Sequence, residues 1–116
     1  AAKRIVPAEP LIEDYLDTRI PEETPHYALL VEWTDYLARR ALSNEVITPG
    51  VTTVGDVRRW LYTQSHAAGF APWFQPDLRV QRQAKAPDSS RGFLAVAKES
   101  LVIEPGDVVW VPQSFF

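Results

Sequence analysis

Apolar residues recur at helical spacing in three places along this chain, and the clearest pattern covers residues 22–44. Positions three and four apart are apolar there, and the opposite face is charged. The apolar positions are Tyr27, Leu30, Val31, Thr34, Leu37, Ala38, Ala41 and Leu42. Pro21 and two acidic residues precede the pattern, and both residue types are favoured in the first turn of a helix. The pattern predicts a long helix that packs on a core and exposes its charged face.

A short helix and a turn are expected on either side of this long helix. Residues 11–16 place apolar side chains at helical spacing over about two turns, after Pro7 and Pro10 have interrupted the chain. We expect a short connecting helix there, within a connector that covers residues 1–20. Residues 48–50 read Thr-Pro-Gly, which is typical of a turn.

A third helix is expected after that turn. Its apolar stripe consists of Val54, Val57, Trp60 and Leu61. Thr53 or Thr52 would cap the helix, since Thr followed three residues later by an acidic residue resembles a capping box. Gly69 would end it. His66 then lies in the last turn, where a cation is favoured by the helix dipole, and we interpret it as a surface residue rather than a ligand.

The second half of the chain changes to the pattern of strands. Residues 77–83 alternate between apolar and polar, which predicts a half-buried strand. Residues 108–111 predict another strand after a turn at residues 104–107, and residues 91–97 are either a strand or a buried loop. The aromatic segment 70–76, with two prolines, is expected to be a packed, irregular entry into the first strand. This order predicts an α+β fold in which two main helices pack on a small antiparallel sheet.

Composition excludes several classes of function. The 116 residues are 46% apolar and carry a net charge of -3, which gives no electrostatic reason to bind nucleic acid. The absence of cysteine excludes disulfides, thiolate metal sites and a cysteine nucleophile. No apolar run approaches a membrane span, and the first residues lack the apolar core of a signal peptide. We expect neither a nucleic acid nor a membrane as partner, and the compartment stays open.

The residues by themselves offer little catalytic chemistry. The two histidines, His26 and His66, both fall in expected helices, so a serine–histidine–acid arrangement is not expected. The carboxylates lie mainly on helix faces and in turns rather than in a cluster of metal ligands. No catalytic residue and no metal ligand is therefore assigned.

One surface is a candidate for substrate binding, because aromatic side chains stand beside basic and amide ones. Its residues are Trp73, Phe74, Arg79, Gln81 and Arg82. Such a surface could line a peptide or carboxylate pocket. The favoured interpretation is a packed aromatic corner beside a solvated strand face, and peptide binding is the alternative.

Three segments resemble the pita-bread metallopeptidases, a family that includes aminopeptidase P, prolidase, methionine aminopeptidase and creatinase. They are residues 41–57, which contain the specific Ile47-Thr-Pro-Gly-Val-Thr-Thr53, then Trp-Phe-Gln-Pro at 73–76 and Pro-Gly-Asp-Val-Val at 105–109. The likeness covers nearly residues 8–111 and is greatest to bacterial members similar to Xaa-Pro aminopeptidase. It implies that residues 21–111 form half of a pita-bread domain.

The resemblance also implies a hydrolase lineage. In this family two α+β halves enclose a pair of divalent metals (Mn, Co or Zn), which activate a water for amide hydrolysis at peptide N-termini. The first metal ligand, an Asp, would stand at about the position of Pro112, and no histidine follows His66. None of the family's ligands therefore carries over to this chain. We expect residues 112–116 to be a tail outside the family pattern, as truncation or a frameshift would leave.

Three hypotheses follow for the function. The chain is a truncated metallopeptidase domain that binds no metal and is inactive alone, or a peptide-binding or assembly module, or a structural fragment without a function of its own. A half domain would leave the strand at residues 108–111 uncovered, and uncovered strand edges invite pairing. We therefore expect self-association or a complementary half-domain as partner, with peptide as the substrate of the full-length family.

Overall fold

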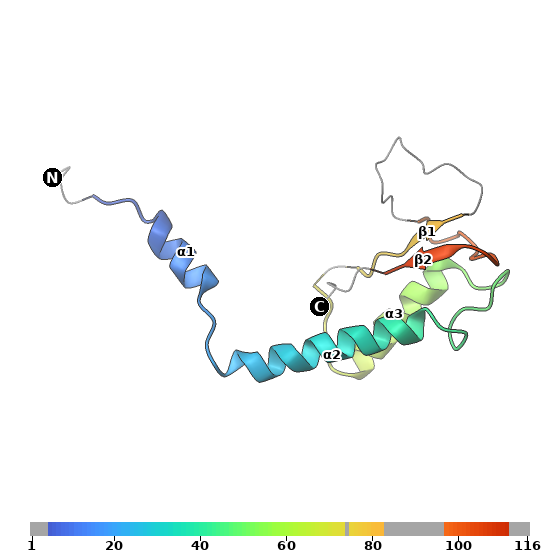
Figure 1. Cartoon of the computed structure of the whole chain (residues 1–116), viewed down its shortest axis with the longest axis horizontal. Coiled ribbons are helices and arrows are strands. Elements are labelled where there is room, and N and C mark those ends of the chain that lie inside the picture. The colour runs from blue at the N-terminus through green and yellow to red at the C-terminus, as the bar shows by residue number, and fades with distance from the viewer. Residues whose placement is uncertain (1–4, 74, 83–96, 112–116) are drawn as a thin grey trace. The chain divides into compact units, whose positions relative to one another are not determined.

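The computed structural model describes residues 5–73, 75–82 and 97–111 of the chain. Within these residues lie three helices and a two-stranded antiparallel sheet (Figure 1). The elements are α1 (Glu9–Asp17), α2 (Glu23–Ala41), α3 (Val54–Ala67), β1 (Arg79–Gln81) and β2 (Val108–Trp110). This small, mostly helical arrangement confirms the α+β prediction. Among the helices described, none is long and apolar enough to cross a membrane.

The chain divides into two compact units, Ala1–Leu30 and Val31–Phe116. The first unit contains α1, which confirms the expected short helix, although the helix begins earlier than expected. Pro10 lies in its first turn, where a missing N–H removes no helical hydrogen bond. Thr18 ends the helix, because its backbone is extended, with a ψ of 127°; its amide and its hydroxyl both donate to the carbonyl of Asp14, at 3.0 and 2.5 Å. No residue of α1 is buried.

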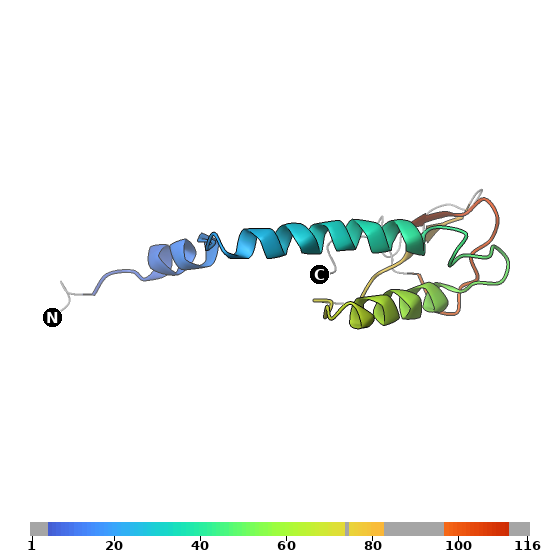
Figure 2. The ribbon, with the colours of Figure 1, turned by 90° about the horizontal axis from the view of Figure 1, so that it is seen from below.

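The second unit contains the core. Its side chains come from the second half of α2, from residues 42–53 (here called the corner), from α3 and from the segments around the two strands. Helix α3 runs alongside the second half of α2 (Figure 2). The buried cluster consists of Leu37, Ala41, Ile47, Val54, Val57, Leu61, Leu78, Ile103 and Val111. The predicted core face of α2 is thus confirmed only in part. Tyr27 and Val31 are 70% and 53% exposed, so the pattern extends beyond the portion of the helix that packs.

The start of α3 confirms the predicted capping box. The Thr53 hydroxyl accepts from the amide of Asp56 at 3.1 Å, and the Asp56 carboxylate accepts from the amide of Thr53 at 2.9 Å. Thr52 has a different role, because its buried hydroxyl accepts from the amide of Thr48 at 2.9 Å and donates to the carbonyl of Val46 at 3.3 Å. At the other end, Gly69 has a φ of 80° just beyond α3, which confirms the predicted stop.

The sheet forms where the alternating patterns predicted it, over shorter spans. Strands β1 and β2 pair antiparallel, with the partners Arg79 and Trp110, Val80 and Val109, and Gln81 and Val108. The chain returns to this region at Ala97, whose amide donates to the carbonyl of Leu78 at 3.0 Å. The expected loop or strand at residues 91–96 lies outside the described residues.

The expectation of a packed aromatic segment before β1 is wrong for Trp73. Its side chain is 86% exposed, whereas Pro76 and Leu78, which follow it in the sequence, are fully buried. Phe70 does pack, edge-on against Trp33 with ring centroids 5.9 Å apart. Phe74 lies outside the described residues.

Candidate functional site

The corner between α2 and α3 is joined to a segment about fifty residues further along the chain. Residues 50–55 and residues 99–103 share four backbone hydrogen bonds. From nitrogen to oxygen, these join Gly50 to Ile103 (2.7 Å), Ile103 to Thr52 (2.9 Å), Val54 to Leu101 (2.9 Å) and Gly55 to Glu99 (2.9 Å). The approach is close, since a Cβ added at Gly55 would lie 3.1 Å from the carbonyl oxygen of Glu99. A side chain at this position would require residue 99 to move by a few tenths of an ångström.

The turn at residues 104–107 is fixed by a buried carboxylate. Gly106 takes a φ of 88°, which suits glycine at the third position of a turn that begins with Glu104. The side chain of Asp107 is 2% exposed and accepts from the amide of Glu104 at 2.9 Å. Arg82 donates to both of its oxygens, at 3.1 and 3.0 Å, and to the carbonyl of Val102 at 2.9 Å. The bond to Asp107 raises the pKa of Arg82 above its ordinary value.

A buried arginine links α3 to both neighbouring segments, and the sequence analysis missed it. Arg58 donates from Nε to the carbonyl of Pro76 at 3.0 Å and from Nη1 to the carboxylate of Glu99 at 2.6 Å. A signal was present in the sequence. At helical spacing, position 58 falls on the same face as Val54 and Leu61, so a charge there stands within the apolar stripe and needs a buried partner.

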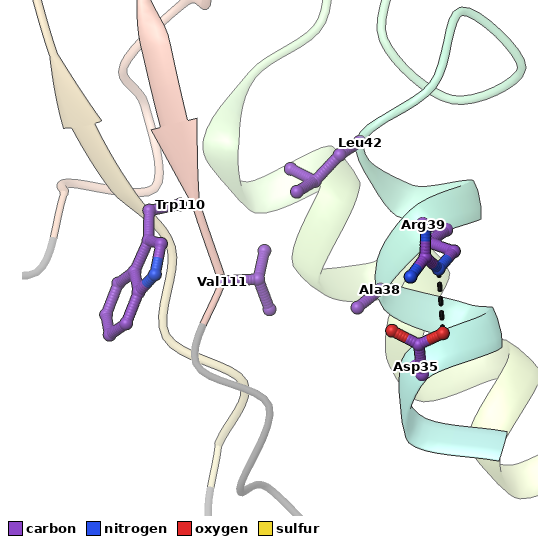
Figure 3. A pocket seen from close by; sticks show the side chains of 6 residues that line it. All are labelled: Asp35, Ala38, Arg39, Leu42, Trp110 and Val111. Carbon is purple, nitrogen blue, oxygen red and sulfur yellow. Dashed lines mark hydrogen bonds and ion pairs between the residues drawn. The ribbon is translucent and has the colours of Figure 1, made fainter. Parts of the chain in front are cut away.

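A groove lies between α2 and the end of β2 (Figure 3). It has a volume of about 510 Å³ and is here called the α2–β2 groove. Its lining residues are Asp35, Ala38, Arg39, Leu42, Trp110 and Val111. Val111 points toward Ala38 and Leu42 (Figure 3), and these three apolar side chains line the groove. An ion pair between Arg39 and Asp35, 2.7 Å long, stands at the edge, so the groove offers an apolar interior beside two opposite charges.

Arg79 lies against Trp110, its partner across the two strands. The guanidinium carbon is 5.3 Å from the centre of the ring, within the range of a cation–π contact. The Nε of Arg79 is buried and has no hydrogen-bond partner among the residues described. This contact fixes one face of the Trp110 ring and leaves the side chain 46% exposed.

Of the five residues that the sequence singled out, the four that the structure describes are not brought together. Arg82 is engaged in the turn at residues 104–107, and Gln81 is exposed and donates to the carbonyl of Arg82 at 3.2 Å. Trp73 is exposed, and Phe74 is outside the described residues. None of the four that the structure describes lines the α2–β2 groove, although Arg79 contacts Trp110, which does. Asp35 and Arg39, which do line it, were interpreted from the sequence only as part of a solvated helix face.

No group of three or more histidine, aspartate or glutamate side chains is placed to hold a metal ion in the part of the chain that the structure describes. No protein-family model, curated protein or solved structure matches this chain.

Proposed function

We propose that this chain is part of a metallopeptidase domain of the Xaa-Pro aminopeptidase type. It would be a half pita-bread of hydrolase lineage that catalyses no hydrolysis by itself. One observation carries the proposal. Of the segments that bear the resemblance, 47–53 makes two of the four hydrogen bonds that join residues 50–55 to residues 99–103, and 105–109 follows residues 99–103 after Glu104. This joining supports a single structural unit in which the corner and the turn fold together.

The metal pair of that family would need several carboxylate and imidazole ligands close together. The described residues provide no such group, so they do not fit a metal pair, and no hydrolytic step is derived from them. We propose instead a supporting role, in which α2, α3 and the sheet pack behind a metal centre that other residues hold.

Metal content and peptidase activity of the purified chain test this role. After dialysis against Mn²⁺ or Co²⁺ and removal of the excess, we expect much less than one equivalent of metal per chain. We also expect no cleavage of an Xaa-Pro dipeptide in the presence of either metal. Stoichiometric metal together with turnover by this chain alone would contradict the non-catalytic proposal.

Complementation tests the lineage. A polypeptide that carries the ligand-bearing half of a Xaa-Pro aminopeptidase is mixed with this chain, and we expect the two to co-elute in size-exclusion chromatography. Trp110→Lys places a charge beside the groove and should abolish co-elution. Val31→Lys alters a side chain that is 53% exposed on α2 and serves as the control. Absence of any complex with the unaltered chain would count against the half pita-bread.

Self-association through β2 is proposed on the exposure of that strand. Val108 and Trp110 are 65% and 46% exposed, and within the described residues β2 pairs only with β1. A strand edge without charged side chains favours pairing with another strand. Light scattering during size-exclusion chromatography at several concentrations should show a mass that rises with concentration. A strictly monomeric, folded species at every concentration would contradict this proposal.

A second candidate function is that of a non-catalytic peptide-binding or assembly module, which would use the surface from Trp73 to Arg82. The specific observation in its favour is the Arg79–Trp110 contact beside the α2–β2 groove. The exposed indole of Trp73 adds a further apolar contact. Binding of a labelled peptide measured by fluorescence anisotropy should weaken in Trp73→Ala and in Arg79→Ala. Unchanged affinity in both variants would rule out this surface.

A further inference from the structure

Helix α1 separates its apolar and acidic residues completely. At about 100° per residue, its four apolar side chains fall within an arc of about 140°, and its four acidic side chains fall within another arc of about 140°. The apolar residues are Leu11, Ile12, Tyr15 and Leu16, and the acidic ones are Glu9, Glu13, Asp14 and Asp17. The helix contains no basic residue. It therefore has one apolar face and one face of a single charge sign.

The apolar face is open to solvent within the first unit. Leu11 is 73% exposed, Tyr15 is 80% exposed and Leu16 is 61% exposed. A helix of nine residues gains little stability from its own hydrogen bonds in water, so it is normally held by packing of its apolar face. The face has the properties of a surface that gains stability when a partner covers it.

We propose that α1 is a docking helix for a protein partner that presents an apolar groove bordered by lysine or arginine side chains. The apolar arc would enter the groove, as amphipathic helices do in helix-in-groove recognition. The four carboxylates would lie along its basic borders, which fixes the orientation of the helix and increases the rate of association. Charge complementarity thus identifies the partner's chemistry.

The same charges disfavour other occupants. Amphipathic helices that lie on membranes carry lysine and arginine on the polar face, and anionic headgroups would repel the acidic face of α1. Pairing of α1 with α1 of a second copy would bring eight carboxylates to the borders of one small interface, and like charges at close range oppose association. This proposal does not depend on the metallopeptidase lineage, because residues 9–17 lie outside the segments that carry the specific resemblance.

A titration with two synthetic peptides tests the proposal on the full chain labelled with ¹⁵N. One peptide is an amphipathic helix of leucine and lysine, and the other has glutamate in place of every lysine. We expect the lysine peptide to bind about tenfold or more tightly than the glutamate peptide at low salt, and the preference to shrink as salt is added. Amide shifts should concentrate on residues 9–17.

Variants separate docking by this face from a general attraction between charges. The double variant Leu11→Ser and Tyr15→Ser should weaken binding of the lysine peptide about tenfold or more, because it removes two apolar anchors. Since no residue of α1 is buried, the melting temperature of the chain should not change. Val51→Ser, at a side chain that is 71% exposed in the corner, is the matched control and should leave the affinity unchanged.

Three results would overturn the proposal. One is that the two peptides bind with equal affinity, or that neither peptide binds. Another is binding that the double variant does not weaken, or shifts that centre outside residues 9–17. The third is binding of α1 to vesicles of phosphatidylcholine and phosphatidylglycerol, which would identify a lipid surface as the occupant in place of a protein groove.

Discussion

Helices α1 and α3 both have an amphipathic sequence pattern, but they differ in how many of their residues are buried. In α1 the apolar and polar faces are fully separated, yet none of its residues is buried. In α3 the stripe is interrupted by Arg58 and Ser65, yet six residues are buried. An amphipathic pattern therefore predicts a helix and the face that can pack, but it does not predict whether the rest of the chain covers that face.

The difference between the two helices arises at their N-terminal ends. Helix α3 begins in the corner, where Val54 and Gly55 donate to the backbone of residues 99–103 and Thr53 provides a cap. Helix α1 begins after Ala8, whose side chain provides no cap. Contacts with a distant segment thus hold α3 against the core, whereas the backbone hydrogen bonds of α1 among the described residues are local.

The largest effect is expected from removal of a core side chain in α3. Leu61 is fully buried, and Leu61→Ala should lower the free energy of unfolding by about 2–5 kcal/mol, because it removes packing and leaves a cavity. The matched change in α1, Leu11→Ala, should alter it by less than about 0.5 kcal/mol. Urea denaturation followed by tryptophan fluorescence measures both. A comparable loss in Leu11→Ala would show that the face of α1 is packed.

The next effect concerns the close approach at Gly55. In an ordinary helical position a change from glycine to alanine stabilises, by roughly 0.5–1 kcal/mol. At Gly55 the new Cβ would meet the carbonyl oxygen of Glu99 at 3.1 Å and its Cβ at 3.2 Å, so residues 99–103 must shift. Gly55→Ala should therefore lower the free energy of unfolding by about 1–3 kcal/mol, measured by urea denaturation.

The control for Gly55→Ala is Thr63→Ala, at an exposed position of the same helix, which should be close to neutral. A stabilised Gly55→Ala variant would mean that residues 99–103 do not approach the corner as closely as the structure has them. That result would also remove the main support for a joined corner and turn.

Local features of this fold could be predicted from the sequence, and long-range ones could not. The capping box at Thr53 and Asp56 and the stop at Gly69 were predicted because each depends on residues within one helical turn. The α2–β2 groove and the bond from Arg58 to Glu99 were missed, since the residues that form them are far apart in the sequence. Arg82 was interpreted as a binding residue because alternation in a strand predicts which face of the sheet a side chain is on. It does not predict that the side chain pairs with Asp107, which lies far away in the sequence.

Trp73 shows the limit of composition as a guide to burial. Two prolines and three aromatic residues in a short segment favoured packing, and the indole is nevertheless exposed. The most specific part of the resemblance, residues 47–53, forms a turn and the cap of α3. For that reason it predicts a scaffold in more detail than it predicts chemistry.

A smaller effect is expected from exchange of the two helix caps. Thr53→Ala removes the side-chain acceptor at the start of α3 and should lower the free energy of unfolding by about 1 kcal/mol. The opposite change in α1, Ala8→Ser, should raise the helical signal in circular dichroism without raising the urea midpoint. An equal change of the urea midpoint in both variants would show that α1 and α3 unfold as one cooperative unit.

The smallest effect is the pH dependence contributed by Asp56. Hydrogen bonds from the amide and hydroxyl of Thr53, and then from Arg59, lower the pKa of Asp56 below its ordinary value of 3.8. A carboxylate whose pKa is lowered by folding stabilises the fold fully above its ordinary pKa, and this contribution is lost as the pH falls through the lower, folded value. Asp56→Asn should therefore lower the urea midpoint by a constant amount above about pH 5, and the difference between the two proteins should shrink as the pH falls through the lowered pKa of Asp56. Thr53→Ala removes one of the donors to Asp56, so the same comparison in that background should give a smaller difference. Parallel pH curves for the unaltered chain and Asp56→Asn would show that the carboxylate is not held by the cap of α3, and the contrast with the uncapped start of α1 would then lose its electrostatic part.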